Sequence, residues 1–293
     1  MQQTEQNVNW NTSYGIDWGA AVFVFLSPVV AIGGLITYLY FNGIHFMEPI
    51  HFGVFYFLTG LGITAGFHRY YAHRTHEAHP VVQLFYLIAG AVVVQRPVIE
   101  WARVHRVHHR YSDTELDPHN INQGFFYAHM GWIFQKTPLA NDYSTVPDLL
   151  NDPLALWQRK YYWWLVLIFG VGTSTLIGAM IGRPLGGFLW GFALRMVTQN
   201  HIIYSINSWA HTFGRQTYST KFEARDSFLL ALISNGEGYH SFHHRFANDY
   251  RNGWRWFHWD PSKWFIGFLS WFGLTTNLRR TPSDQILQAK IIS

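Results

Sequence analysis

The chain has 293 residues, of which 13% are charged and 18% aromatic, with a net charge of +4 at pH 7 and no cysteine. The lack of cysteine excludes disulfides, iron–sulfur clusters, thiolate zinc sites and cysteine nucleophiles. Soluble domains carry about 25% charged residues, so this composition favours a membrane protein. The modest positive charge gives no specific support for nucleic-acid binding.

Four stretches are apolar and long enough to cross a bilayer as helices. The second contains Gly62 and Gly66, a small-xxx-small pair suited to close helix packing. The fourth carries Arg195 and Gln199, and polar groups at membrane depth usually face protein or a polar cavity. The predicted spans are 19–40, 49–67, 161–181 and 185–206.

The four spans form two helical hairpins, which place the regions 68–160 and 207–293 on one side of the membrane. Of the 21 Lys and Arg residues, all but Arg183 and Arg195 fall on this side, which is therefore predicted to be cytoplasmic. The shorter apolar stretches 81–94 and 264–274 are predicted to lie on or dip into the membrane surface. The sequence thus predicts an all-α, multi-pass protein of the bacterial inner membrane or endoplasmic reticulum. Its single domain, 1–293, has four transmembrane helices under a cytosolic helical cap.

Nine of the 17 histidines fall into four clusters beside the ends of the spans. Two of these clusters have the spacing HxxHH, which places three imidazoles on one face of a helix. Asn207 stands four residues before His211 and shares its helical face. The clustered residues are His68 and His73; His105, His108 and His109; His211; and His240, His243 and His244.

Nine imidazoles exceed what one ion needs, so the natural division is two ions with four or five nitrogens each. The soluble di-iron bundles use paired Glu-x-x-His motifs, and only Glu237 with His240 has that spacing on this side. His76 and His79 follow His73 closely and are alternatives to one of the nine clustered histidines as a metal ligand. Three further histidines are candidate donors that orient the ligands: His119, His129 and His201.

Several short sequence motifs around these clusters resemble those of the membrane fatty acyl desaturases, most closely the stearoyl-CoA Δ9 branch. The histidine pattern alone is shared with related hydroxylases, whereas E-W-A-R, D-P-H-N and G-E-G-Y-H are more specific. The matching segments are G-I-T-A-G-F-H-R-Y-Y-A-H at 62–73, E-W-A-R-V-H-R-V-H-H-R-Y-S-D at 100–113, D-P-H-N at 117–120, G-F-F-Y-A-H-M-G-W at 124–132, N-S-W-A-H at 207–211 and N-G-E-G-Y-H-S-F-H-H-R-F at 235–246.

The resemblance implies a four-helix membrane fold with a cytosolic cap and two irons held by the nine histidines, with a water held by Asn207. It implies one iron near His68, His105, His109 and His243, and the other near His73, His108, His211, His240 and His244. Because imidazole sites accept zinc readily, zinc is expected as an alternative occupant in an overexpressed sample.

The resemblance also implies substrate contacts. Arg103 matches a position that contacts coenzyme A, and Arg96 and Lys136 are further candidates for its phosphates. Gln95 and Trp101 match residues around the bend of an acyl tunnel, and Tyr56 and Gly60 match the positions that stop the chain. A small Gly60 is expected to leave room, which favours an 18-carbon over a 16-carbon chain.

The expected activity is O2-dependent introduction of a cis double bond into a fatty acyl-CoA within the lipid bilayer. The chain shows no dinucleotide or flavin motif, and no cytochrome b5-like domain is recognised in the 49 residues after His244. A separate electron donor with its reductase is therefore expected, either cytochrome b5 or a ferredoxin-like protein. The alternatives are an acyl-lipid desaturase or a hydroxylase on the same scaffold and, in a different class, a metal transporter.

Overall fold

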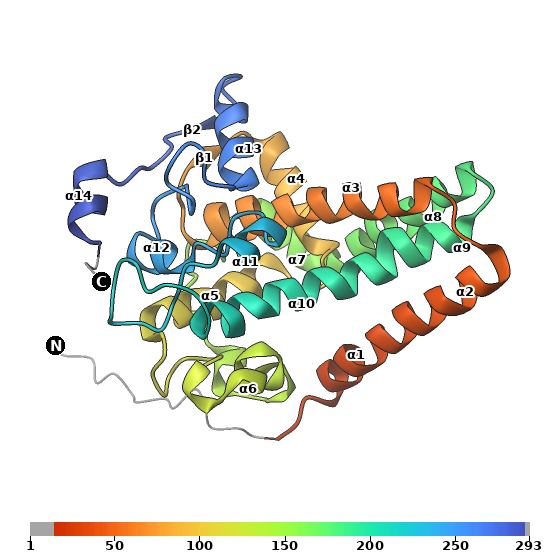
Figure 1. Cartoon of the computed structure of the whole chain (residues 1–293), viewed down its shortest axis with the longest axis horizontal. Coiled ribbons are helices and arrows are strands. Elements are labelled where there is room, and N and C mark those ends of the chain that lie inside the picture. Colours follow the sequence, from red (N-terminus) through yellow and green to blue (C-terminus); the bar gives the residue numbers. More distant parts are fainter. Residues whose placement is uncertain (1–14, 291–293) are drawn as a thin grey trace.

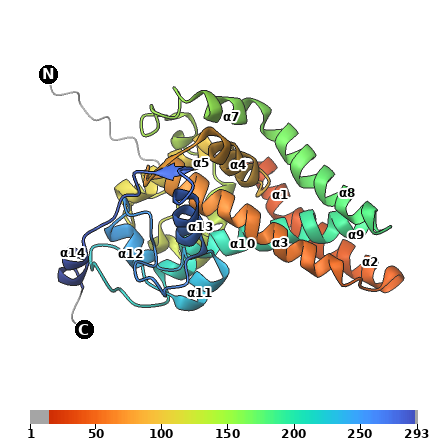
Figure 2. The same ribbon diagram turned by 90° about the horizontal axis from the view of Figure 1, so that it is seen from above.

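The computed structural model describes residues 15–290, so the predicted domain 1–293 extends beyond the described residues at both ends. The described chain is mostly helical. Long helices extend to one side of the molecule, and short helices and loops gather around their other end (Figure 1). The view from above shows α4 (Pro80–Ala91) between α3 (Met47–Leu61) and α7 (Pro153–Leu165), with α14 (Ser283–Gln288) at the opposite end from α8 (Thr173–Met180) (Figure 2).

Three helices in residues 15–290 are long and apolar enough to cross a membrane. Each contains a π-helical segment between or after its α-helical parts. The three are Trp18–Asn42, made of α1 (Trp18–Pro28), η1 (Val29–Gly33) and α2 (Gly34–Asn42); Met47–Ala72, made of α3 (Met47–Leu61) and η2 (Gly62–Ala72); and Pro153–Met180, made of α7 (Pro153–Leu165), η6 (Val166–Gly172) and α8 (Thr173–Met180).

The third of these helices begins at Pro153, well before the predicted start at residue 161. Asp152 caps it, because its side chain accepts hydrogen bonds from the backbone N–H groups of Leu154 and Ala155. Pro153 at the first helical position has a backbone already suited to the helix. The helix begins before the apolar run that defines the predicted span, because the cap at Asp152 and not hydropathy sets its first residue.

The fourth predicted span is also a continuous helical segment, formed by α9 (Pro184–Gly187), η7 (Phe188–Leu194) and α10 (Arg195–Ser208). It is not among the helices that qualify by hydropathy. The reason is its polar content: Arg195, Gln199 and Asn200 are all buried inside the protein. These side chains face the protein interior, as expected for polar groups in a helix of this kind.

The turns at the far end of the hairpins are joined by one arginine. The Nε atom of Arg183 donates to Glu48 Oε1 at 2.9 Å and to the Tyr38 hydroxyl at 2.7 Å. Its Nη2 atom donates to the backbone carbonyls of Asn42 and Gly43. This contact fastens the turn between α8 and α9 to the turn between α2 and α3.

The predicted close packing at Gly62 and Gly66 is confirmed. A Cβ atom on Gly62 would lie 2.5 Å from the backbone nitrogen of Gly90, and one on Gly66 would lie 2.6 Å from Cβ of Tyr86. Both partners belong to α4 (Pro80–Ala91), which packs against η2 and α7. The apolar stretch predicted at 81–94 therefore covers the helix that carries the first histidine pair.

The remaining elements surround the ends of the long helices and carry the other histidines. The N-terminal side of this region is tied to the C-terminal side by a two-stranded antiparallel sheet, in which Glu77 pairs with Thr276. The elements are α5 (Val98–Tyr111), α6 (Phe125–His129), α11 (Phe228–Ile233), α12 (His240–Arg245), α13 (Pro261–Ser270), α14 (Ser283–Gln288), the 3₁₀ helices η3 (Ile121–Gln123), η4 (Gly131–Phe134), η5 (Pro138–Asn141) and η8 (Trp209–His211), and the strands β1 (Glu77–Ala78) and β2 (Thr275–Thr276).

Candidate metal centre

The two HxxHH motifs form helices, as predicted from their spacing. The first lies on α5 and the second on α12. His68 and His73 are five residues apart, which would separate them around an α-helix. Here His68 lies on the π-helical segment η2 and His73 is its C-terminal cap, where the His73 N–H donates to the His68 carbonyl over 3.1 Å. This i→i+5 pattern brings the two rings to one side, with 4.9 Å between their centroids.

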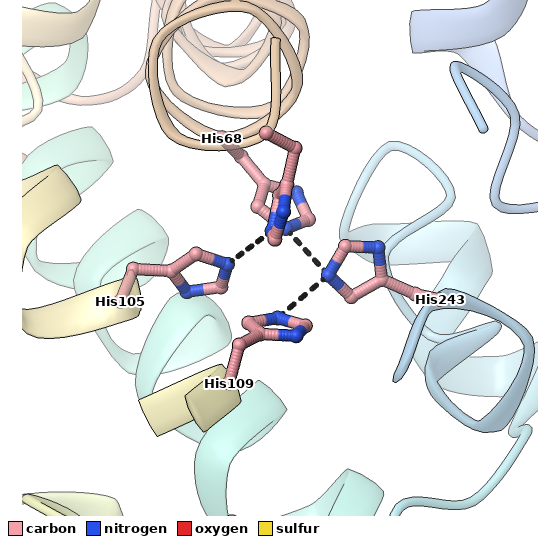
Figure 3. Close-up of side chains that lie close together, drawn as sticks. His68, His105, His109 and His243 are labelled. Atoms are coloured by element: carbon pink, nitrogen blue, oxygen red, sulfur yellow. Dashed lines mark hydrogen bonds between the residues drawn. The ribbon is translucent and has the colours of Figure 1, made fainter. Parts of the chain in front are cut away.

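Five histidines form the first group, and their ring nitrogens lie within 4.8 Å of one another. The Nε2 atoms of His68 and His243 are 2.9 Å apart, and those of His243 and His109 are also 2.9 Å apart. Figure 3 shows four of these rings turned toward a common point from three segments of the chain. The group consists of His68, His73, His105, His109 and His243.

Four further histidines form the second group, again within 4.8 Å. Their Nε2 atoms are 3.2 Å apart between His108 and His244, 3.1 Å between His240 and His211, and 3.0 Å between His244 and His240. The α-helical spacing of α5 thus divides its histidines, since His108 points to this group while its neighbour His109 points to the other.

The expected partition of the histidines is wrong at one position. His73 was expected with His108 and His211, but its Nε2 atom lies 2.8 Å from Nε2 of His105. It therefore belongs to the group of five. The physical reason is the π-helix, which keeps His73 on the same side as His68 instead of turning it toward the second group.

Carboxylates hold the outer nitrogens of three of these histidines. The Nδ1–H of His68 donates to Glu237 at 2.7 Å, that of His108 to Asp117 at 2.9 Å, and that of His211 to Asp113 at 2.9 Å. Such a contact fixes the tautomer, leaving the Nε2 lone pair free for a metal ion. These three carboxylates were not predicted as partners of the histidines. Asp113 and Asp117 follow the first HxxHH by only four and eight residues, which was the available signal.

Burial keeps these imidazoles neutral. It holds the pKa of His105, His108 and His243 well below the ordinary histidine value, and the neighbouring imidazoles lower each pKa further. Six of the nine histidines are less than a tenth exposed: His68, His108, His211, His240, His243 and His244. Neutral imidazole is the form that binds a metal ion.

The donor set fits metal ions in both groups. Nitrogens bound at about 2.1 Å and at right angles to one another would be about 3.0 Å apart, which matches the Nε2 spacings in each group. Because His68 and His211 donate through Nδ1 to carboxylates, their Nε2 atoms are acceptors and face other imidazole nitrogens. A cation between these nitrogens would satisfy their lone pairs.

The other histidines near these clusters are not in either group. His76 contacts Thr75 and the Tyr86 hydroxyl, and His79 is exposed at the N-terminal cap of α4. His129 and His201 pair with each other, with 3.1 Å between Nε2 and Nδ1. His119 is buried beside His108 and Asp117 and is the one of the three candidate orienting residues that contacts a histidine of either group.

A cavity of about 420 Å³ opens beside the first group. His105 forms part of its wall, and Trp101 stacks on that imidazole with 5.0 Å between ring centroids. The Trp101 indole N–H donates to Gln95 Oε1 at 3.0 Å, and both side chains line the cavity, as does Asn207. Three of the predicted residues, Gln95, Trp101 and Asn207, are therefore brought together. Most of the wall is apolar, and half of the residues that line it come from the helices α1, α7 and α10.

A second cavity of about 320 Å³ adjoins the first through Arg96, Val104 and Trp132, which line both. Its wall is mostly apolar in area, and we name it the polar cavity after the charged side chains that line it, one of which is Asp17. Arg103 and Lys136 also line it. The Arg103 guanidinium is almost fully buried, donates to the Ala140 carbonyl at 2.5 Å and lies over the Tyr143 ring. The three basic residues expected to meet phosphates thus share one cavity.

Tyr56 and Gly60 are not among the residues lining either of these cavities. The Tyr56 hydroxyl donates to the Ile233 carbonyl at 2.5 Å. The room expected beside Gly60 is already filled, because a Cβ atom there would lie 2.4 Å from Asn235 Nδ2 and 3.3 Å from Gln199 Nε2. The preference for an 18-carbon chain therefore has no support from an empty space at Gly60.

The comparisons with known proteins agree with this site. A family model described as fatty acid desaturase matches residues 48–261. A probable acyl-CoA desaturase of Schizosaccharomyces pombe is 37% identical over 276 residues, which cover 92% of this chain and 56% of the relative. This chain thus spans about half the length of that relative.

Two animal proteins are matched over more of their length. Stearoyl-CoA desaturase 5 of Bos taurus is 36% identical over 241 residues, or 80% of this chain and 72% of the relative. An acyl-CoA Delta(11) desaturase of Trichoplusia ni is 32% identical over 270 residues, or 89% and 76%. With these matches and the histidine groups, the chain belongs to the fatty acid desaturase family.

Proposed function

We propose that this protein is an O2-dependent acyl-CoA Δ9 desaturase that introduces a cis double bond into a saturated fatty acyl chain. The observation that carries the proposal is the apolar cavity whose wall includes the metal-ligand candidate His105. An acyl chain in this cavity lies beside the first histidine group. The names of the relatives, which are acyl-CoA or stearoyl-CoA desaturases, support this substrate class.

The nine histidines would hold two iron ions, with a water on Asn207 completing the surroundings of the site. Bound iron would supply the O2 and one-electron chemistry that removal of two hydrogens from an unactivated chain requires. The protein's own task is positioning, because the methylenes of the substrate are chemically alike. Trp101 and Gln95 do this by fixing the wall of the cavity next to His105.

The polar cavity supports a coenzyme A head group. Arg96, Arg103 and Lys136 supply positive charge for its phosphates. Because Arg96 lines both cavities, a substrate with its head group in the polar cavity extends its acyl chain into the apolar one. Binding energy from the head group then sets the register of the chain at the histidines.

The protein is proposed to span the membrane four times, with α9, η7 and α10 as the fourth helix and both histidine groups on the cytoplasmic side. The distribution of Lys and Arg supports this orientation. Electrons are proposed to come from a separate cytochrome b5 or ferredoxin-like donor with its reductase. An acidic donor would be attracted to the basic cytoplasmic surface.

Expression in a desaturase-deficient host tests the proposal. We expect monounsaturated fatty acids with the double bond at one position, located by mass spectrometry of derivatised lipids. A variant with His108→Ala serves as the control and should give none. A hydroxy fatty acid without a monoene would replace the proposal with a hydroxylase, and metal transport without any change in lipids would replace it with a transporter.

A further inference from the structure

The connection between α4 and α5 has an unusual backbone. Val94 has φ of 63° and Arg96 has φ of 148°. A β-branched residue in the left-handed region is a genuine outlier, and such conformations persist only where the surroundings determine them. Gln95 lies between these two residues, and all three line the apolar cavity. The strained connection is therefore part of the wall of the proposed substrate site.

Arg195 holds the start of this connection. Its Nη1 and Nη2 atoms both donate to the Val92 carbonyl at 3.1 Å, and its Nε atom donates to the Gly191 carbonyl at 3.2 Å. Arg195 is fully buried, and a fourth hydrogen bond goes to the side-chain oxygen of Gln199. All four bonds go to neutral oxygens. A buried cation in such a helix is costly and is a functional candidate by default.

Two residues of α7 hold the end of the same connection. The Arg96 N–H donates to the Tyr162 hydroxyl at 3.1 Å, and the Val98 N–H donates to Gln158 Oε1 at 3.0 Å. Tyr162 and Gln158 are both buried. The connection is thus fixed at both ends by polar side chains from two other helices, which explains how its backbone strain is maintained.

The connection leads directly to the first histidine group. Gln95 Oε1 accepts the indole N–H of Trp101, and the Trp101 ring stacks on His105. A displacement of Gln95 therefore moves Trp101, the part of the cavity wall that stacks on the His105 imidazole. Since the reacting groups must be placed within a fraction of an ångström, a small displacement here changes which carbons are reached.

We propose that Arg195 is a positioning residue that sets the position of the new double bond. It acts through the Val92 carbonyl, the strained connection and the Gln95–Trp101 pair. The inference rests on the proposed desaturase function and adds a determinant of product position that touches neither the substrate cavity nor the histidines. The Arg195 side chain forks onto one carbonyl, a geometry that lysine cannot reproduce because it is a single point charge.

The test measures the distribution of double-bond positions produced by Arg195→Met, Arg195→Lys and Tyr162→Phe, with metal content and melting temperature of each protein. Arg195→Met should raise the share of monoene with displaced double bonds about tenfold while metal content is retained. Arg195→Lys should be intermediate, because an ammonium still donates to the carbonyl. Tyr162→Phe should shift positions in the same direction by less.

Arg183→Met is the matched control. Arg183 also binds two backbone carbonyls, but at the far turns of the hairpins. The Arg183→Met variant should have a lower melting temperature and an unchanged double-bond position. If Arg195→Met does not accumulate, the other two variants decide the question. The inference is overturned if folded, metal-replete Arg195→Lys and Tyr162→Phe proteins both make the wild-type isomer alone. A wild-type protein that makes no monoene would instead overturn the proposed function.

Discussion

The Nδ1 atom of His68 lies 2.7 Å from Oε2 of Glu237, deep inside the protein. The other carboxylate oxygen of Glu237 accepts a hydrogen bond from Arg69 at 3.0 Å, and Arg69 also pairs with Asp260. Asn252 donates to Glu237 as well. A metal-ligand candidate on the long helix is thus connected to the segment before the second HxxHH motif and to the loop before α13, so the site and the packing of the cap depend on one another.

Glu237→Gln tests this connection. Glutamine keeps the size of the side chain, but its neutral amide oxygen accepts hydrogen bonds from His68 and Arg69 more weakly than the carboxylate does. Loss of such an outer partner typically weakens metal binding about 10–100-fold. We expect the first group to lose its metal while the second keeps it, giving one metal ion per chain by mass spectrometry of the metals. Retention of two ions at limiting metal would show that Glu237 does not orient His68.

The two histidine groups predict separable metal sites. His109→Ala should remove the ion of the group of five, and His108→Ala that of the group of four, because adjacent residues on α5 point to different groups. Each variant should keep about one ion and lose desaturation. The exposed His79 supplies the control, since His79→Ala should retain both ions and activity. Loss of both ions from either variant alone would mean that the groups form one inseparable site.

Trp101→Ala should retain both ions, because the ring stacks on His105 without offering a ligand nitrogen. It removes the cavity wall beside that imidazole, so we expect a slower reaction or displaced double bonds. Trp101→Phe keeps part of the stacking and should lie closer to the wild type. Product analysis with metal determination on the same sample checks this. An unchanged rate and position in Trp101→Ala would exclude a role for Trp101 in positioning.

Lys136→Met tests the polar cavity as the head-group site. Lys136 lines that cavity without lining the apolar one. Losing a charge-assisted contact to phosphate should raise KM for acyl-CoA about tenfold, with kcat unchanged, since Arg96 and Arg103 still hold the head group and keep the register of the chain. The difference from wild type should shrink at high salt. A fall in kcat at constant KM would place Lys136 in a different role.

The sequence was sufficient for features that depend on regular helices. The HxxHH spacing predicted the faces of α5 and α12, and Gly62 with Gly66 predicted the close packing of η2 on α4. The partition of the histidines was less predictable, because His73 depends on a π-helical segment and not on α-helical spacing.

Features that depend on loops and on distant contacts were not predictable from spacing. Asp113 reaches His211 from a left-handed backbone conformation, with φ of 61°, just past α5. The space beside Gly60 is filled by Asn235, which is distant in the sequence and also left-handed. In both cases a single residue outside a regular helix decides where a side chain lies, and the hydrophobic pattern carries no information about it.

The most direct test of the account supplies purified, iron-loaded protein with fully deuterated stearoyl-CoA, O2 and a reduced electron donor. Mass spectrometry then identifies the product. We expect a monoene that has lost two deuterium atoms in all, one from each new alkene carbon, with the double bond at carbon 9. An acyl product that gains oxygen, or substrate that stays saturated in protein containing two iron ions per chain, would contradict it.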